Sequence, residues 1–147
     1  LYLAATDAGL TDLLFASEID PLPIVAAGGT EAGHILQETE RQLAEYFAGE
    51  RRVFEIPLAP SGTEFRLAIW RALCEIPYGQ TISYGELAER LDKPDAVRAV
   101  GTANGANPIA IIVPCHRVIG ADGSLTGYGG GLEIKRKLLR LEGAILV

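Results

Sequence analysis

The stretch from Asn107 to Gly120, NPIAIIVPCHRVIG, constrains this chain more than any other. It contains an apolar run, Ile109 to Val113, whose length and composition predict a short buried strand. Pro114 follows, with its own φ fixed at about −65°, and it favours an extended conformation in the residue before it. The sequence therefore places Cys115 where a stiff strand gives way to a turn.

The residues that follow Cys115 indicate a nucleophile. His116 and Arg117 provide a cationic neighbourhood, which favours the thiolate, and the thiolate is the form of cysteine that attacks. The alternative is a buried thiol that packs as a small hydrophobe, and composition alone favours this alternative. Cys74, near the end of a predicted helix, is expected to be such a packed, inert thiol.

The first 57 residues are predicted to form a small α/β unit that supports the rest of the chain. Apolar and turn patterns predict two strands joined by a turn at 7–9, then a loop at 19–29, a helix with Thr30 as its N-cap, and a third strand. The ranges are 1–5 and 13–16 for the first strands, 30–48 for the helix and 53–57 for the last strand. Residues 58–62, LAPSG, have the composition of a linker.

Residues 63–147 are predicted to form a second, mostly helical unit. Helices are expected at 63–75, 84–91, 94–103 and 132–142, and Ser83 with Glu86 forms a capping-box pattern before the second of them. The two short helices across a tight break are typical of a helix-turn-helix. A hairpin of 109–113 and 118–119, with a turn at 121–124, completes the prediction of a winged-helix-like domain.

Charge and composition exclude several classes of protein. The net charge of −6 argues against a generic nucleic-acid binder, although the balance from Lys93 to Glu142 is +3 and that of the remaining residues is −9. Two cysteines and two histidines do not fall at metal-ligand spacing, so no metal is expected. No secretion signal or membrane-spanning run is present, which predicts a reducing, cytoplasmic location, or a nuclear one in a eukaryote.

Six ordered blocks carry a resemblance to one family: residues 76–85 (IPYGQTISYG), 98–101 (RAVG), 107–108 (NP), 114–118 (PCHRV), 127–131 (GYGGG) and 141–143 (LEG). Together they resemble the O6-alkylguanine-DNA alkyltransferases, also called methylated-DNA–protein-cysteine methyltransferases. In this family a cysteine takes an alkyl group from O6 of a damaged guanine. The similarity is dense from about Ser61 to Gly143, and several blocks in order are far more specific than PCHR alone.

The resemblance implies a fold and a set of catalytic roles. The fold would be a ribonuclease-H-like N-terminal domain followed by a winged-helix-like DNA-binding domain. Cys115 would be the nucleophile, His116 would remove its proton, and Glu142 would orient the imidazole. Neighbours on an extended chain point to opposite sides, which favours a water between thiol and imidazole. Asn107 would hold the active-site loop, although by itself it reads as an ordinary Asn-Pro turn residue.

The resemblance also implies how the base is bound. Tyr84 would donate a proton as guanine leaves, and the main-chain carbonyl groups of Val118 and Cys115 would accept from the guanine amino group. Gly129 would present its N–H to O6, in a position where many relatives have serine, and Tyr128 would wall the pocket. Arg98 would fill the space of the flipped nucleotide. Without the resemblance, Arg98 and Glu142 would be interpreted as solvated charges, and residues 129–131 would be interpreted as a flexible loop.

The expected partner is double-stranded DNA, bound as a monomer through the minor groove with little dependence on sequence, and no cofactor is implied. The acidic charge and Gly105, which replaces a basic residue of many relatives, predict modest affinity and a steep salt dependence. Two alternatives stay open at this point. A lesion sensor on the same scaffold would lack the nucleophilic cysteine, and a thiol hydrolase would turn over and leave the helix-turn-helix unexplained.

Overall fold

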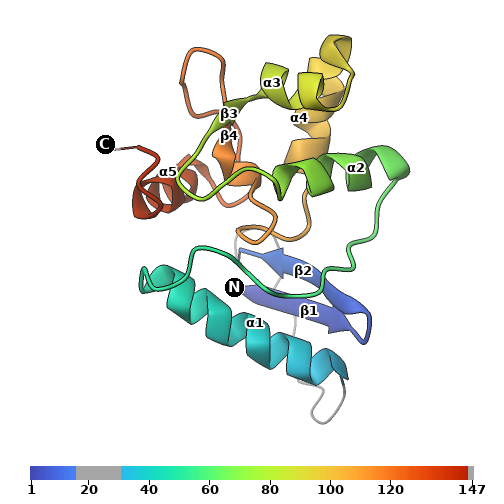
Figure 1. Cartoon of the computed structure of the whole chain (residues 1–147), viewed down its shortest axis with the longest axis vertical. Coiled ribbons are helices and arrows are strands. Elements are labelled where there is room, and N and C mark those ends of the chain that lie inside the picture. The colour runs from blue at the N-terminus through green and yellow to red at the C-terminus, as the bar shows by residue number, and fades with distance from the viewer. Residues whose placement is uncertain (16–30, 146–147) are drawn as a thin grey trace.

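A computed structural model describes residues 1–15 and 31–145 of the chain. Figure 1 shows two layers: a hairpin with one long helix at the N-terminal end, and a cluster of shorter helices above it. The predicted loop at 19–29, the N-cap Thr30 and the strand end at Ala16 lie outside the described residues. No helix in the described part of the chain combines the length and apolar character needed to cross a membrane.

The N-terminal hairpin consists of β1 (Tyr2–Thr6) and β2 (Gly9–Leu14), which pair antiparallel. The predicted second strand began too late, at residue 13. The turn is shorter than expected, so that residues 9–12 already pair with β1, with an irregularity between Ala4 and Ala5. Leu10 and Leu13 are fully buried on the core side of β2.

Helix α1 (Glu31–Phe47) packs on the hairpin and confirms the predicted amphipathic helix. The strand predicted at 53–57 is wrong, because these residues form no strand; the isolated bridge to β2 joins Leu10 to Leu58, directly after them. The side chain of Gln42 on α1 instead hydrogen-bonds both the N–H and the carbonyl of Glu55, at 2.9 and 3.3 Å. A helix side chain thus satisfies the backbone that a strand partner would have satisfied.

The C-terminal unit begins with α2 (Glu64–Leu73), capped by Thr63. The short strand β3 (Ile82–Ser83) leads into α3 (Tyr84–Arg90), and the Oγ of Ser83 accepts from the N–H of Glu86 at 3.1 Å, as the capping-box pattern predicts. A 3₁₀ turn, η2 (Pro94–Ala96), precedes α4 (Val97–Gly105), which packs against α3. The last helix is α5 (Leu132–Leu141). The predicted pair of short helices across a break is confirmed.

The hairpin predicted at 109–113 and 118–119 is wrong. Residues 109–113 are buried, but they form tight turns rather than a strand, and Ile111 adopts a left-handed φ of 70°. β4 (Val118–Ile119) pairs in parallel with β3 instead. Burial was predicted correctly because an apolar run reports burial, whereas its conformation depends on partners distant in sequence. The turn predicted at 121–124 is present, with the N–H of Gly120 donating to the carbonyl of Ser124 at 2.9 Å.

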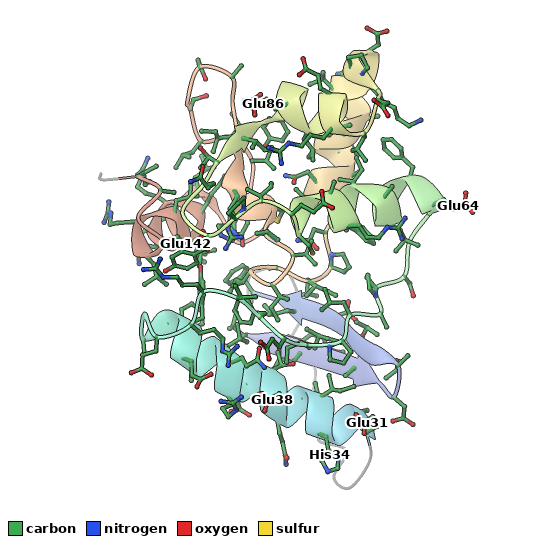
Figure 2. All side chains as sticks on the ribbon, in the orientation of Figure 1. Glu31, His34, Glu38, Glu64, Glu86 and Glu142 are labelled. Atoms are coloured by element: carbon green, nitrogen blue, oxygen red, sulfur yellow. The ribbon has the colours of Figure 1, made fainter. Side chains whose placement is uncertain are left out.

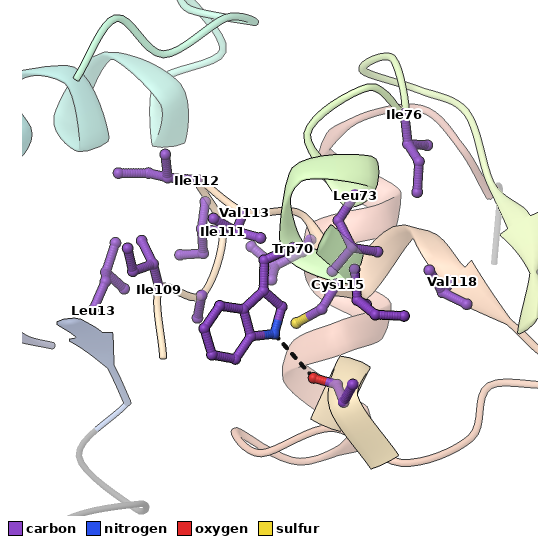
Figure 3. Close-up of a cluster of buried hydrophobic side chains, with 14 of the residues drawn as sticks. Leu13, Trp70, Leu73, Ile76, Ile109, Ile111, Ile112, Val113, Cys115 and Val118 are labelled. Atoms are coloured by element: carbon purple, nitrogen blue, oxygen red, sulfur yellow. Dashed lines mark hydrogen bonds between the residues drawn. The ribbon is translucent and has the colours of Figure 1, made fainter. Parts of the chain in front are cut away.

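One apolar cluster joins the two layers (Figure 3). Leu13 of β2 donates its N–H to the carbonyl of Pro108 at 2.8 Å, and its own carbonyl accepts from the N–H of Ala110 at 3.0 Å. Trp70 of α2 lies in the same cluster and donates from Nε1 to the carbonyl of Ala103 on α4 at 3.0 Å. The turn-rich segment 109–113 is therefore clamped between the N-terminal hairpin and the helices, directly before Cys115.

Candidate active site

Cys115 opens a single 3₁₀ turn, η3 (Cys115–Arg117), rather than ending a strand. Its N–H donates to the carbonyl of Val113 at 2.8 Å, and the N–H of Arg117 donates to the carbonyl of Pro114 at 3.0 Å. Because the chain is helical here, the expectation that the Cys115 and His116 side chains point to opposite sides of an extended strand does not apply. Cys115 is 8 % exposed and lines a small cavity, as described below.

Asn107 holds the segment that leads to Cys115. Its Nδ2 donates to the carbonyl groups of Val113 and Ile109 at 2.8 and 3.3 Å, and its Oδ1 accepts from the N–H of Ile109 at 3.0 Å. One amide therefore closes the loop 107–113 from both ends. This is the local geometry expected of a residue that fixes an active-site loop.

Glu142, directly after α5, accepts hydrogen bonds from three side chains. Nε2 of His116 lies 2.8 Å from its Oε2, the hydroxyl of Tyr46 donates to the same oxygen at 2.6 Å, and Arg117 donates to both carboxylate oxygens at 2.8 and 3.0 Å. Figure 2 shows Glu142 where the C-terminal helix meets the N-terminal layer. Burial alone would raise the pKa of Glu142, but the hydrogen bonds from His116, Arg117 and Tyr46 outweigh it and lower that pKa to about 2. The carboxylate is therefore ionised at neutral pH.

His116 is fully buried beside this carboxylate, and burial lowers its pKa below the ordinary histidine value, with Glu142 opposing the shift. The resting imidazole is therefore neutral. Because a carboxylate only accepts, the hydrogen-bond network assigns the proton to Nε2 and leaves the lone pair on Nδ1. Among the described residues no group hydrogen-bonds to Nδ1. The imidazole is thus held as a base whose acceptor nitrogen is available for a proton.

Lys135 of α5 lies at the edge of this site and was not singled out by the sequence interpretation. It is fully buried, and its Nζ donates to the carbonyl groups of Val118 and Thr126 at 2.7 and 2.9 Å. Burial lowers its pKa to about 8, while electrostatic attraction to Cys115 raises it. The same attraction favours the thiolate form of the cysteine. A signal was present, because Lys135 shares the apolar face of α5 with Leu138 and Leu139.

The cavity beside Cys115 has a volume of about 20 Å³, which is room for about one water molecule. Residues from both layers line it: Phe15, Asn104, Gly105, Asn107, Ala110, Cys115, Gly127, Tyr128, Gly129 and Gly130. Four predicted site residues, Cys115, Asn107, Tyr128 and Gly129, therefore lie around one space. No group of three or more His, Cys, Asp or Glu side chains among residues 1–15 and 31–145 is arranged to hold a metal ion.

Comparison with known proteins assigns both layers to one family. The ribonuclease-like domain of 6-O-methylguanine DNA methyltransferase matches residues 1–60, and the DNA binding domain of the same protein matches residues 64–144. The chain belongs to the 6-O-methylguanine DNA methyltransferase family. The predicted family and the predicted α/β fold class, with its DNA-binding second part, are confirmed.

Individual relatives of this family cover nearly the whole chain. A methylated-DNA–protein-cysteine methyltransferase of Methanosarcina mazei is 50 % identical over 97 % of this chain and 89 % of its own length, and that of Mycolicibacterium paratuberculosis is 53 % identical over 97 % and 85 %. The structure of Mycobacterium tuberculosis OGT in complex with DNA matches at 48 % identity and a TM-score of 0.81, covering 97 % of this chain and 85 % of that one.

Besides His116 and Glu142, three predicted site residues do not line the cavity: Tyr84, Val118 and Arg98. The hydroxyl of Tyr84 donates to the carbonyl of Thr126 at 3.3 Å, in a loop that Lys135 also holds. The carbonyl of Val118 already accepts from Lys135, which leaves one of its two lone pairs for a base. Arg98 is exposed on α4, the helix whose last residues, Asn104 and Gly105, line the cavity.

Sequence interpretation missed Lys135, Tyr46 and Phe15 as members of this site and expected the wrong environment for Cys74. Tyr46 looked like one apolar residue of α1, since nothing in a helix pattern shows that its hydroxyl reaches Glu142. Cys74, expected to be packed, is exposed at the end of α2. Cys74 is the more exposed thiol, and burial raises its pKa. Cys115 is buried next to His116, whose Nε2 is held by Glu142, and interacts electrostatically with Lys135.

Proposed function

We propose that this chain repairs O6-alkylguanine in DNA by transferring the alkyl group to Cys115. One observation carries the proposal: Cys115 lines a cavity directly before a neutral, buried His116 whose Nε2 is held by an ionised Glu142. Relatives over 97 % of the chain bear the name methylated-DNA–protein-cysteine methyltransferase, which supports the same chemistry.

The proposed reaction uses the described side chains in sequence. The thiol proton of Cys115 passes to Nδ1 of His116, directly or through a water, and Glu142 stabilises the imidazolium that forms. The sulfur then bonds to the alkyl carbon while the bond between that carbon and O6 of guanine breaks. Guanine leaves with the bonding electrons and takes up one proton, so that the proton lost by the thiol balances the one gained by the base.

Lys135 and Tyr84 have supporting roles in this proposal. The ammonium group of Lys135 favours the thiolate and fixes the carbonyl groups of Val118 and Thr126 at the edge of the site. Tyr84 is the proposed proton donor to the leaving base; its hydroxyl donates to the carbonyl of Thr126, and its ring lies against Gly101 of α4. Gly129 is the proposed backbone donor to O6, and Tyr128 the proposed wall of the pocket.

The helix-turn-helix is the proposed DNA-binding element. The exposed Arg98 lies near the start of α4, and Asn104 and Gly105 at its end line the cavity with Cys115. A nucleotide rotated out of a duplex bound along α4 would therefore reach the cysteine, while Arg98 fills the gap in the stack. We propose minor-groove binding that is largely independent of sequence, by a monomer located in the cytoplasm.

A thioether is not cleaved by any group in the site, so each molecule acts once. The test is to incubate the protein with a duplex that carries a radiolabelled O6-methylguanine and to follow the label. We expect label on the protein, up to one equivalent and no further, and none on Cys115→Ser. Tight binding of the duplex without label transfer would instead identify a lesion sensor, and hydrolysis of an ester with turnover would identify a hydrolase. Either result would overturn the proposal.

A further inference from the structure

The N-terminal layer contributes a side chain to the cavity around the nucleophile. Phe15 follows β2 directly, yet only 8 % of it is exposed, and it lines the same space as Cys115. Among the described residues that line this cavity, Phe15 comes from the ribonuclease-like domain and the others come from 104–130. This layer therefore does more than support the second one.

Phe15 is packed against the glycine-rich segment 127–131 at two points. Its ring meets that of Tyr128 edge to face, with centroids 5.7 Å apart and planes at 61°. At Gly130 a Cβ atom would lie only 2.6 Å from Cδ2 of Phe15, so the ring occupies the space that any side chain there would need. Packing against the ring therefore limits how closely segment 127–131 can approach Cys115.

The cavity left between these groups is small. Its volume of about 20 Å³ has room for about one water molecule, so a flipped base and its alkyl group can enter only when lining groups move. The backbone of 127–131 cannot withdraw freely, because the preceding Thr126 is held by Lys135 and Tyr84. The ring of Phe15 packs against Tyr128 and Gly130 of this segment and lines the cavity, so it occupies part of the space around Cys115.

We propose that Phe15 is a specificity-determining residue that limits the size of the alkyl group transferred to Cys115. This inference rests on the proposed alkyl transfer and adds a substrate preference to it. Reducing the ring to a smaller side chain enlarges the space beside the sulfur, which favours a bulky alkyl group over methyl. Apolar pockets that differ by a few carbon atoms typically discriminate by roughly 10- to 200-fold.

The test compares two duplexes, one with O6-methylguanine and one with O6-benzylguanine, in single-turnover reactions followed by intact mass. We expect Phe15→Ala to raise the ratio of benzyl to methyl transfer rates by roughly tenfold or more over wild type, and Phe15→Leu to raise it less. Phe65→Ala removes the same ring from the partly buried face of α2, outside the cavity, and should leave the ratio unchanged.

The outcomes separate this inference from the proposed function. Wild type that transfers no methyl group contradicts the function itself. Wild type that transfers methyl, together with an unchanged rate ratio in Phe15→Ala, overturns the size limit alone. If Phe15→Ala does not melt cooperatively, the decision falls to Phe15→Leu, which retains most of the apolar volume: a raised ratio supports the inference and an unchanged ratio overturns it.

Discussion

The hydroxyl of Tyr46, on the long helix of the ribonuclease-like domain, donates a 2.6 Å hydrogen bond to Oε2 of Glu142 at the end of the last helix. The same oxygen lies 2.8 Å from Nε2 of His116. Burial raises the pKa of Tyr46 far above its ordinary value, so the phenol stays a donor at every accessible pH. A residue of one domain thus helps to fix the carboxylate that holds His116, the proposed base, in the other.

Tyr46→Phe removes this donor and keeps the ring. We expect the free energy of unfolding to fall by about 1.5–3 kcal/mol, as for a hydrogen bond to a charged group. Since the Tyr46 hydrogen bond lowers the pKa of Glu142, the variant should also begin to unfold at higher pH on acidification. Urea unfolding from pH 7 to pH 3 checks both effects. Tyr2→Phe, in β1, is the matched control, and equal curves for the two variants would show that the contact contributes nothing.

Glu142 should make the folded protein less stable as pH falls. Its pKa is about 2 in the folded state against a model-peptide value of 4.5, so the unfolded chain binds the proton more tightly. The stabilisation is therefore complete above about pH 4.5 and is lost as pH falls towards 2. The shift corresponds to something on the order of 3 kcal/mol.

Glu142→Gln tests this directly. The neutral amide leaves the buried Arg117 without its anion, which should destabilise the protein by about 3–5 kcal/mol at pH 7. The difference in unfolding free energy between the variant and wild type should shrink as pH falls from 4.5 to 2, because wild type loses the charge of Glu142 over the same range. If the unfolding free energies of the two proteins ran parallel from pH 4.5 to pH 2, the lowered pKa of Glu142 would be contradicted. We also expect slower alkyl transfer, because nothing then stabilises the imidazolium of His116.

Stability and alkyl transfer should both depend on the Nδ2 donor of Asn107. Asn107→Asp keeps an acceptor for the N–H of Ile109 but turns an anionic oxygen towards the carbonyl groups of Ile109 and Val113. We expect it to lose roughly 2–3 kcal/mol or more, at least as much as Asn107→Ala. Transfer should slow in both variants because η3 moves with the loop. Thermal melting and single-turnover rates measure the two effects, and a fully active Asn107→Asp would contradict the role of the amide donor.

Lys135→Met removes the buried ammonium group but keeps most of the side-chain volume. We expect alkyl transfer to slow about tenfold or more near pH 7, since the thiolate loses a cation and two carbonyl groups lose their donor. Because the pKa of Lys135 is about 8, wild type loses the same charge above that pH, and its advantage should disappear there. Lys137→Met, on the exposed face of α5, is the control. A rate ratio that does not change between pH 7 and pH 9.5 would count against the electrostatic role.

Arg98 should matter only when a nucleotide has to leave a duplex. Arg98→Ala is expected to slow transfer from duplex DNA by roughly tenfold or more while leaving transfer from the free base O6-benzylguanine nearly unchanged. Arg90→Ala removes an exposed arginine from the end of α3 and serves as the control. Equal rates for Arg98→Ala and wild type on the duplex would rule out the proposed flipping role.

Sequence reasoning succeeded where the signal was local. Ser83 caps α3 through the N–H of Glu86, and the apolar spacing of α1 and α5 gave helices close to the observed ones. It failed for 109–113, because an apolar run reports burial without conformation. The partners that fix this run are Leu13, far away in sequence, and the side chain of Asn107. The left-handed Ile111 is invisible to any periodic pattern.

The sequence indicated the site residues near the Cys115 motif but not those that tertiary contacts bring in from elsewhere in the chain. The motif around Cys115 and the family resemblance supplied Cys115, His116, Glu142 and Asn107, which the fold brings together. Phe15 and Tyr46 reach the site only because the two layers pack on each other, so their roles depend on tertiary contacts across the whole chain. Lys135 could have been found, since a lysine on the apolar face of an amphipathic helix indicates a buried charge with partners.

The most direct test of this account is to expose the protein to an excess of duplex containing O6-methylguanine and to map the modified residue by peptide mass. The chain supplies its own control, because Cys74 is the more exposed thiol. The account predicts a gain of one methyl group per chain, on the peptide that contains Cys115 and on no other. Methylation of Cys74 instead, or an unmodified protein after the lesion has been bound, would contradict the claim that the surroundings of Cys115 make it the nucleophile.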